Sequence, residues 1–301
     1  MRPSKSDDVP VARKPTVSIL TTSYNHARWL PDTLNSVRRQ DYPHIEHVVV
    51  DDGSSDGSVD LLGSWPDPDL VWTSGPNRGQ AKALNQAFKM SSGEIIGWLS
   101  SDDVYYDRGV VRAVVDAFVK HPEAALVYGH AVLINGAGLQ LHAEWVPPTR
   151  MLRWRPPPHF IQPAVFVRRS ALGDKMVDES YEVAMDSELW RRLARNHVFL
   201  RLDRVLAAER HHLGRKSYTM NATASDEGRR LGVWHPGSGW IAHARHKTWR
   251  VAYRLAGLTL VPRIVPRPDG FDGRLDSRVA LVCRQLAVPR SRLPLGVEER
   301  H

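Results

Sequence analysis

Cysteine is almost absent from this chain of 301 residues, which contains Cys283 alone. A single thiol can form neither an internal disulfide nor a cysteine-rich zinc site, and this favours a reducing compartment. The N-terminal residues lack the apolar run of a secretory signal. The longest apolar run near the C-terminus, 255–265, contains Pro262 and Arg263 and is too short to span a bilayer. We therefore expect a cytoplasmic protein that is soluble, or at most lies on the inner face of a membrane.

Net positive charge is absent from most of the chain, although the formal net charge of the whole is +8. Residues 229–301 hold 14 Lys and Arg against 5 Asp and Glu, which leaves 27 basic and 28 acidic residues in the first 228. A domain that follows nucleic-acid phosphates carries its own basic face, so we expect no nucleic-acid partner. Hydrophobic residues at 42% and charged residues at 25% exclude wholesale disorder and a fibrous repeat.

The composition divides the chain into three parts. Residues 1–15 are polar and contain several prolines, which predicts a flexible arm. Residues 16–228 have the length of one α/β domain. Residues 229–301 form a basic extension, expected to be helical, that contains Trp234, Trp240 and Trp249. Two interpretations stay open for these tryptophans: contact with an anionic membrane surface, or packing against the domain.

Short apolar strands alternate with amphipathic helices through the middle of the chain. The expected strands are 17–23, 47–51, 70–73, 94–99 and 124–128, and the expected helices are 29–40, 79–90, 110–120 and 185–196. Residues 136–165 are rich in Pro and Gly, which predicts a region dominated by loops. Alternation with short connections predicts an α/β fold with a mostly parallel sheet covered by helices on both faces. Ligands of such sheets bind beyond the carboxyl ends of the strands.

Two pairs of carboxylates fall at these strand ends. Asp51 and Asp52 end the second strand, and Asp102 and Asp103 follow the fourth. Adjacent carboxylates repel one another unless a cation lies beside them, and a divalent ion there could also bind phosphate oxygens. The alternative for the second pair is a solvated turn in which Asp103 caps the next helix. A carboxylate of the first pair could accept from the N–H of a planar base, or belong to a capped loop.

Two further groups are ambiguous when taken alone. Asp186 enters a helix, where an acid is usually a cap, and only a sugar-like acceptor close by would make it a general base. The sequence Arg210-His211-His212 contains paired histidines, which are more often surface or packing residues than metal ligands.

Six blocks, taken in order, resemble glycosyltransferase family 2, whose members have the GT-A fold. The blocks are 17–25, 48–56, 77–85, 93–103, 160–163 and 186–193, and the resemblance runs from about residue 16 to 219. It implies a hexosyltransferase-like enzyme that uses a nucleoside-diphosphate sugar of the UDP, GDP or dTDP type. The sugar would pass with inversion to a hydroxyl of a glycan, lipid-linked or other acceptor, in glycan or polysaccharide biosynthesis. The implied cofactor is Mg²⁺ or Mn²⁺.

The resemblance also implies roles for individual residues. Those that would bind the nucleotide are Thr22, Tyr24, Asp52, Arg78, Lys82 and Asp102. Asp103 would be the direct metal ligand with His212 beside it, His211 being the alternative, and Asp186 would be the catalytic base. The acceptor region would include Gln162 and Glu179. Many relatives carry Asp or Asn where Ser100 stands, which predicts a loosely held ion because a hydroxyl is a weaker ligand.

Two other functions remain as alternatives. A nucleotidyl or sugar-phosphate transferase would normally carry a Gly- and Lys/Arg-rich phosphate loop after its first strand, where this chain has Thr22 to His26. A non-catalytic nucleotide-sugar-binding relative is disfavoured because Asp52, Asp103 and Asp186 are all present.

Overall fold

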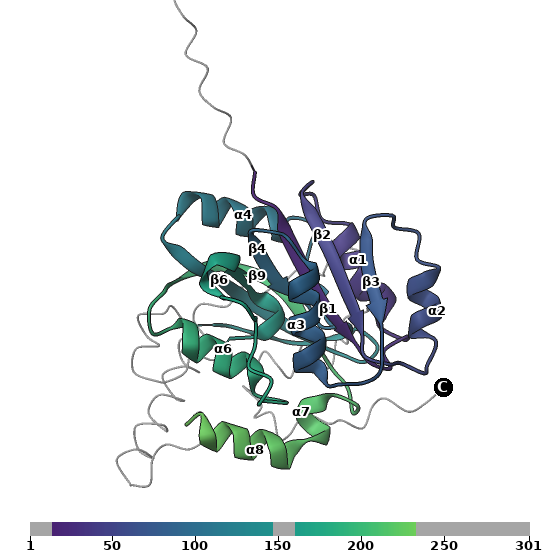
Figure 1. Ribbon diagram of the computed structural model, residues 1–301. Coiled ribbons are helices and arrows are strands. Elements are labelled where there is room, and N and C mark those ends of the chain that lie inside the picture. Colours follow the sequence, from purple (N-terminus) through teal and green to yellow (C-terminus); the bar gives the residue numbers. More distant parts are fainter. Residues whose placement is uncertain (1–13, 147–159, 233–301) are drawn as a thin grey trace, which may run out of the picture.

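The computed structural model describes residues 14–146 and 160–232 (Figure 1). The predicted arm lies almost entirely outside these ranges. The three tail tryptophans and nearly all of the basic extension also lie outside them. Within the described residues, no helix combines the length and the apolar character needed to cross a membrane.

One mixed sheet organises the described part of the chain. Its strands are β1 (Val17–Ser23), β2 (Ile45–Asp51), β3 (Leu70–Ser74), β4 (Ile95–Trp98), β5 (Val104–Tyr105), β6 (Ala124–Asn135), β7 (Gln140–Glu144), β8 (Val165–Arg168) and β9 (Val198–His211). The order is β3-β2-β1-β4-β8-β6-β9-β5, with β7 paired to β6. Six of these nine described strands run one way, whereas β5, β7 and β8 run the other. The prediction of a mostly parallel α/β sheet is confirmed.

Helices cover both faces of this sheet. They are α1 (Leu30–Arg38), α2 (Ser58–Gly63), α3 (Gln80–Met90), α4 (Val110–Lys120), α6 (Met185–Leu193), α7 (Lys216–Thr219) and α8 (Asn221–Arg230), with short 3₁₀ turns at Gln162–Ala164 and Arg169–Ala171. Side chains alternate along β2, so Val49 packs with Leu30 of α1 and Leu62 of α2. Its neighbours Val48 and Val50 belong to the larger core on the other face, where α3 lies (Figure 1).

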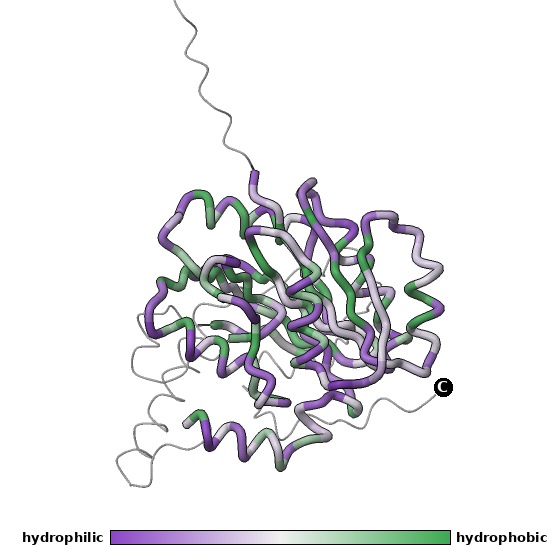
Figure 2. The backbone as a smooth tube through the Cα atoms, viewed as in Figure 1, coloured by the Kyte–Doolittle hydropathy of each residue, from purple (hydrophilic) through white to green (hydrophobic). Residues whose placement is uncertain are grey.

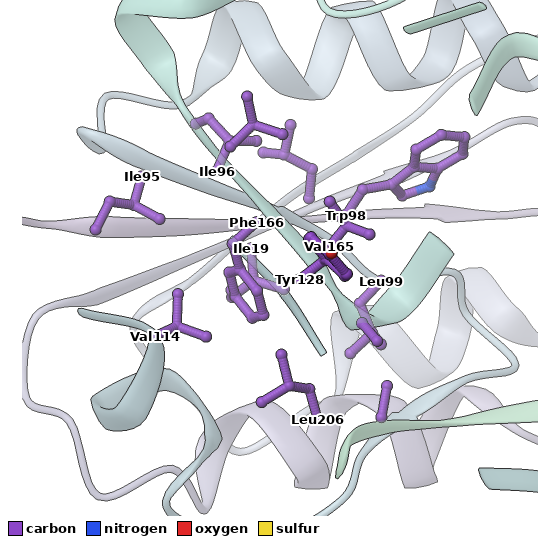
Figure 3. Close-up of a cluster of buried hydrophobic side chains, with 14 of the residues drawn as sticks. Ile19, Ile95, Ile96, Trp98, Leu99, Val114, Tyr128, Val165, Phe166 and Leu206 are labelled. Atoms are coloured by element: carbon purple, nitrogen blue, oxygen red, sulfur yellow. The ribbon is translucent and has the colours of Figure 1, made fainter. Parts of the chain in front are cut away.

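The larger core lies between the sheet and helices α3, α4 and α6. Apolar residues concentrate along the central strands, while polar residues follow the outer loops (Figure 2). Figure 3 shows Ile19 and Phe166 on one face of the sheet and Ile96 on the other, and each is fully buried. Burying a side chain of this size contributes about 1.5–3 kcal/mol. This packing fixes the strand ends on which the site is built.

Several predicted boundaries differ from the structure. The fifth expected strand, 124–128, continues to Asn135 because it pairs with three other strands, β7, β8 and β9. The expectation that loops dominate 136–165 is wrong where β7 and the start of β8 lie. The helix expected to reach residue 196 ends at Leu193. Helix α8 runs to Arg230 and therefore crosses the domain boundary predicted at 228.

Candidate active site

The end of β1 lies between the loops that follow β2 and β4. The backbone N–H of Asp52 donates to the carbonyl of Ser23 at 2.8 Å, and the N–H of Ser101 donates to the carbonyl of Thr22 at 3.3 Å. These contacts draw the two acidic segments toward one strand end at the carboxyl edge of the sheet. Thr22 and the first acidic loop therefore lie beside the Asp102-Asp103 segment, as the resemblance implies.

Asp51 holds the loop after β2 in shape. Its Oδ2 accepts from the N–H of Gly53 at 3.2 Å, the N–H of Ser54 at 3.0 Å and the hydroxyl of Ser74 at 2.8 Å. The side chain is 1% exposed, so these bonds satisfy a carboxylate that burial would otherwise disfavour. Asp51 is thus a structural acid, and it fixes the position of its neighbour Asp52.

Asp52 connects this loop to the start of α3. Its two carboxylate oxygens accept from the N–H groups of Arg78 and Gly79, at 2.8 and 2.9 Å. Gly53 allows the close approach, because it has φ +83° and a Cβ there would lie 3.0 Å from the backbone nitrogen of Asn77. The contacts place the backbone of Arg78 beside the acid that the sequence assigns to the nucleotide.

A cavity of about 300 Å³ opens where these segments meet. Its lining includes Asp52, Arg78, Lys82 and Glu179, four of the residues singled out from the sequence. An adjoining cavity of about 580 Å³ also has Glu179 in its lining. Three predicted nucleotide ligands and one predicted acceptor residue therefore line the same cavity. Tyr24 lies outside this lining and is 48% exposed.

The turn after β1 is tied to the loop after β2. Asn25 has φ 55°, a backbone conformation that Asn adopts more readily than most residues. Its N–H donates to Ser54 Oγ and its Oδ1 accepts from the N–H of Ser55, both at 2.8 Å. The N–H of Ala27 donates to Asp56 at 2.8 Å. These bonds on both sides fix the orientation of the intervening residue, His26.

Three side chains from distant parts of the sequence converge next to this turn. Ligand atoms of His26, Asp102 and His212 all lie within 4.8 Å of one another. His212 Nε2 lies 3.0 Å from Asp102 Oδ2, and His26 Nδ1 lies 2.8 Å from Ser101 Oγ. His212 is 3% exposed, and its Nδ1 has no hydrogen-bond partner within the described residues. Sequence reasoning missed His26, whose local context is only a turn after a strand.

The two adjacent acids of the loop after β4 point in different directions. Asp103 Oδ1 accepts from the backbone N–H of Arg210 at 2.8 Å, whereas Asp102 meets His212. The resemblance implies Asp103 as the direct metal ligand with His212 beside it, whereas in the structure His212 contacts Asp102. Burial and the neighbouring charge of Asp102 raise the pKa of Asp103 well above its usual range. Asp103 thus has the environment of an inward, structural acid.

Arg210 secures this arrangement from β9. Its guanidinium is buried, donates from Nε to the carbonyl of Asp102 at 2.8 Å, and forms an ion pair with Asp32 of α1 at 2.9 Å. One residue therefore holds both acids, through its backbone to Asp103 and through its side chain to Asp102. A buried guanidinium has a rigid planar set of donors suited to this task.

The structure separates the two histidines that the sequence left as alternatives. His211 Nδ1 lies 2.6 Å from the Tyr218 hydroxyl, and its Nε2 lies 3.0 Å from Glu209. Glu209 also pairs with Arg215. Both ring nitrogens of His211 are thus engaged away from Asp102, which leaves His212 as the histidine of the site.

Asp186 lies in the first turn of α6. Burial raises the pKa of its carboxyl to about 6, and the negative charge of Glu209 adds to the effect. The N–H of Ser187 donates to Asp186 Oδ1 at 2.5 Å. Asp186 is the second residue of α6, whose N-cap is Ala184, and no side chain caps this helix start. Glu227 of α8 accepts from the N–H groups of residues 182, 183 and 184, just before the helix, at 2.6 to 2.9 Å.

Gln162 holds the segment that leads to the acidic pair. Its side-chain amide donates to the carbonyl of Trp98, and its Oε1 accepts from the hydroxyl of Ser100 at 3.3 Å. Ser100 is therefore bound to this amide. Gln162 supports the β4 loop in the structure.

Comparison with known proteins identifies relatives of the domain. A family model described as "Glycosyl transferase family 2" matches residues 18–173, just over half of the chain. A relative from Nostoc sp., described as an uncharacterized glycosyltransferase, is 33% identical over 123 residues, 40% of this chain and 38% of that protein. The putative teichuronic acid biosynthesis glycosyltransferase TuaG of Bacillus subtilis is 39% identical over 94 residues, 30% of this chain and 37% of that protein. The chain spans about two fifths of the length of these curated relatives.

Solved structures share the fold. The mannosyltransferase PcManGT from Pyrobaculum calidifontis, in complex with GDP-Man and Mn²⁺, matches with a TM-score of 0.57 and 19% identity. The match covers 82% of this chain and 77% of the mannosyltransferase. The expected GT-A architecture is confirmed.

Proposed function

Because this chain belongs to glycosyl transferase family 2, we propose that it transfers a sugar, with inversion and metal assistance, from a nucleoside-diphosphate sugar to an acceptor hydroxyl. The observation that carries the proposal is the meeting of Asp102 and His212 beside the end of β1. This cluster lies at the carboxyl edge of the sheet, where such folds bind nucleotides. The neighbouring cavity carries the cationic side chains Arg78 and Lys82, which suit a diphosphate.

The side chains around Asp102 fit a divalent cation. A carboxylate and an imidazole are common ligands of divalent cations. Two ligands about 2.1 Å from an ion and at right angles to one another are about 3 Å apart, close to the distance between His212 Nε2 and Asp102 Oδ2. When bound, the cation would neutralise charge on the departing diphosphate.

Asp186 would be the base that takes the proton from the acceptor hydroxyl. A carboxyl with a pKa of about 6 is ionised at neutral pH, yet is more basic than an ordinary aspartate. Arg215 acts electrostatically on Asp186, Asp102 and Asp103, and so links the base to the acidic pair. Attack of the activated hydroxyl on the anomeric carbon, opposite the leaving diphosphate, would invert the configuration without a covalent enzyme intermediate. Glu179, which the resemblance assigns to the acceptor region, lines the cavity that also holds Arg78 and Lys82.

The test is a transfer assay on the full chain. The protein is incubated with UDP-, GDP- and dTDP-sugars and Mn²⁺, and the released nucleoside diphosphate is measured with and without EDTA. We expect one donor class to be consumed, EDTA to suppress turnover, and Asp102→Asn to lose it. His197→Ala is the matched control because this histidine is exposed at the end of α6.

Two results would contradict the proposal. Full turnover in EDTA would show that transfer needs no metal. Retention of configuration in the product, read by NMR of the anomeric proton, would exclude a single displacement. Nucleotide binding without turnover for every donor and for simple sugar acceptors would favour the non-catalytic alternative.

The biological setting is also a proposal. The likeness to TuaG supports an acceptor in polysaccharide biosynthesis. With a lipid-linked acceptor, the basic residues 229–301 would hold the enzyme at the cytoplasmic face of an anionic membrane. Co-sedimentation with vesicles tests this: binding to anionic but not neutral vesicles is expected at low salt, and protein that stays in the supernatant with both contradicts it.

A further inference from the structure

His26 occupies a place in the cluster that neither the sequence motifs nor the proposed roles explain. The residue lies in the turn after β1, whereas Asp102 follows β4 and His212 follows β9. Ligand atoms of all three nevertheless lie within 4.8 Å of one another. Bonds from an ion to nitrogen and oxygen are about 2.0–2.2 Å long, so two ligands of one ion are at most about 4.4 Å apart. The three side chains therefore need to approach one another by only a few tenths of an ångström to bind one ion.

The surroundings of His26 are those of a metal-binding imidazole. Its Nδ1 is engaged with Ser101 Oγ at 2.8 Å, which leaves Nε2 for an ion. A histidine that binds a metal almost always uses its other ring nitrogen in such a hydrogen bond, because the bond fixes the tautomer and the ring orientation. The backbone of the turn is fixed as well, through the contacts of Asn25 and Ala27 with the neighbouring loop.

Trp29 holds the two imidazoles in relation to one another. The centroid of its ring lies 3.9 Å from that of His212 and 5.3 Å from that of His26, and its Nε1 donates to the carbonyl of Gly136 at 2.9 Å. The His26 and His212 rings are nearly perpendicular, with centroids 5.6 Å apart. An aromatic wall on one side of the cluster limits access of water and reduces the freedom of both rings.

We propose that His26 is a third protein ligand beside Asp102 and His212, and that it makes this site select a first-row transition-metal ion over Mg²⁺. Two imidazoles and one carboxylate suit Mn²⁺, Co²⁺ or Zn²⁺, whereas Mg²⁺ prefers an all-oxygen environment and retains its water. The inference deepens the proposed function, and rests on it only in assigning the ion to the donor diphosphate.

The test is metal titration of the full chain without any sugar donor. CoCl₂, MnCl₂ and MgCl₂ are titrated by calorimetry, and Co²⁺ is also followed by its visible absorption. His26→Asn is the informative variant, because its amide can keep the bond to Ser101 while it lacks an atom at the Nε2 position. We expect His26→Asn to weaken Co²⁺ binding about tenfold or more and Mg²⁺ binding by less than about threefold. His197→Ala should match the wild type.

Three outcomes would overturn the inference. The first is wild-type Co²⁺ affinity in His26→Asn. The second is an equal loss of Co²⁺ and Mg²⁺ affinity in that variant. The third is a Co²⁺ affinity that falls in His26→Ala but returns to the wild-type value in His26→Asn. The last would assign His26 to supporting Ser101. Should the variants fail to fold, the anomalous difference map of a Co²⁺-soaked wild-type crystal decides, since the ion must lie within bonding distance of His26 Nε2. The transfer assay is independent of these results, so the proposed function can stand or fall separately.

Discussion

Asp186→Asn should remove activity and at the same time stabilise the protein. As the base, the carboxylate is needed for transfer, and its loss should lower turnover by about 10²-fold or more. As a partly buried charge, the same carboxylate costs folding free energy, since desolvation raises its pKa from 3.8 to about 6. Asparagine has nearly the same shape but no charge. It can therefore neither act as the base nor impose the folding cost of a charged carboxylate.

The size and sign of the stability effect follow from the pKa. A rise of about two units corresponds to a cost on the order of 3 kcal/mol when the group is ionised. The folded state holds its proton more tightly than the unfolded state, so the cost is absent below about pH 4. It develops as pH rises from about 4 to 6 and is complete above pH 6. Asp186→Asn should therefore raise the melting temperature at pH 7 and have little effect at pH 4.

The activity of the wild type should follow the same group. With a pKa of about 6, close to a tenth of Asp186 is ionised at pH 5. The value of kcat/KM should therefore fall about tenfold between its plateau and pH 5, and Asp186→Asn should lack this dependence. The wild type and Asp186→Asn are both measured by thermal unfolding and by release of nucleoside diphosphate from pH 4 to pH 7.

Glu188→Gln provides the matched control in the same turn of α6. Glu188 pairs with Arg192 at 3.1 Å, an i,i+4 contact that contributes about 0.5 kcal/mol or less. The control should keep its activity and lose slight stability. A loss of stability in Asp186→Asn would refute the argument, since that is the result expected of a helix cap. Normal turnover would place the base elsewhere.

Three further changes test the framework of the site. Glu227→Ala should lower the free energy of unfolding by about 1–3 kcal/mol, measured in urea, because three N–H groups before α6 lose their acceptor, and Glu227→Gln should recover part of it. Gly97→Ala should cost about 1–3 kcal/mol in the same assay, since its Cβ would lie 2.7 Å from the Tyr105 hydroxyl, whereas Gly63→Ala has ordinary contacts and should be neutral. Asn25→Ala should lower the melting temperature more than Asn25→Gly, because alanine resists φ 55°. A ranking opposite to any of these would contradict the corresponding contact.

Local sequence patterns predicted the elements that are held by contacts between residues close together in the sequence. The helix expected at 110–120 has these bounds in the structure, since its apolar residues lie on one face at helical spacing. Strand β9 was missed because Arg201, Asp203 and Arg204 interrupt its apolar pattern. Its pairing with β6 and β5 depends on residues far away in the sequence, which no local window contains.

The site was predicted in the same uneven way. The residue types and their place at the strand ends followed from the sequence, and Asp52, Arg78 and Lys82 do line one cavity. The sequence could not tell which of the adjacent acids Asp102 and Asp103 contacts His212. The answer depends on the backbone N–H of Arg210, which binds Asp103 from 107 residues away. His26 was missed for the same reason, since its partner Ser101 is 75 residues distant.

The position of β9 in the sheet gives the protein a definite order of assembly during synthesis. Strand β9 lies between β6 and β5, and its partner Val104 leaves the ribosome about a hundred residues before Ala208. Until residues 198–211 emerge, the nascent chain holds β6 with an open edge, which other strands could join. The same late strand and the residue after it carry Arg210 and His212. The proposed site can therefore be complete only once this strand has closed the sheet, and a chain stalled earlier would lack Arg210 and His212 and keep an exposed strand edge.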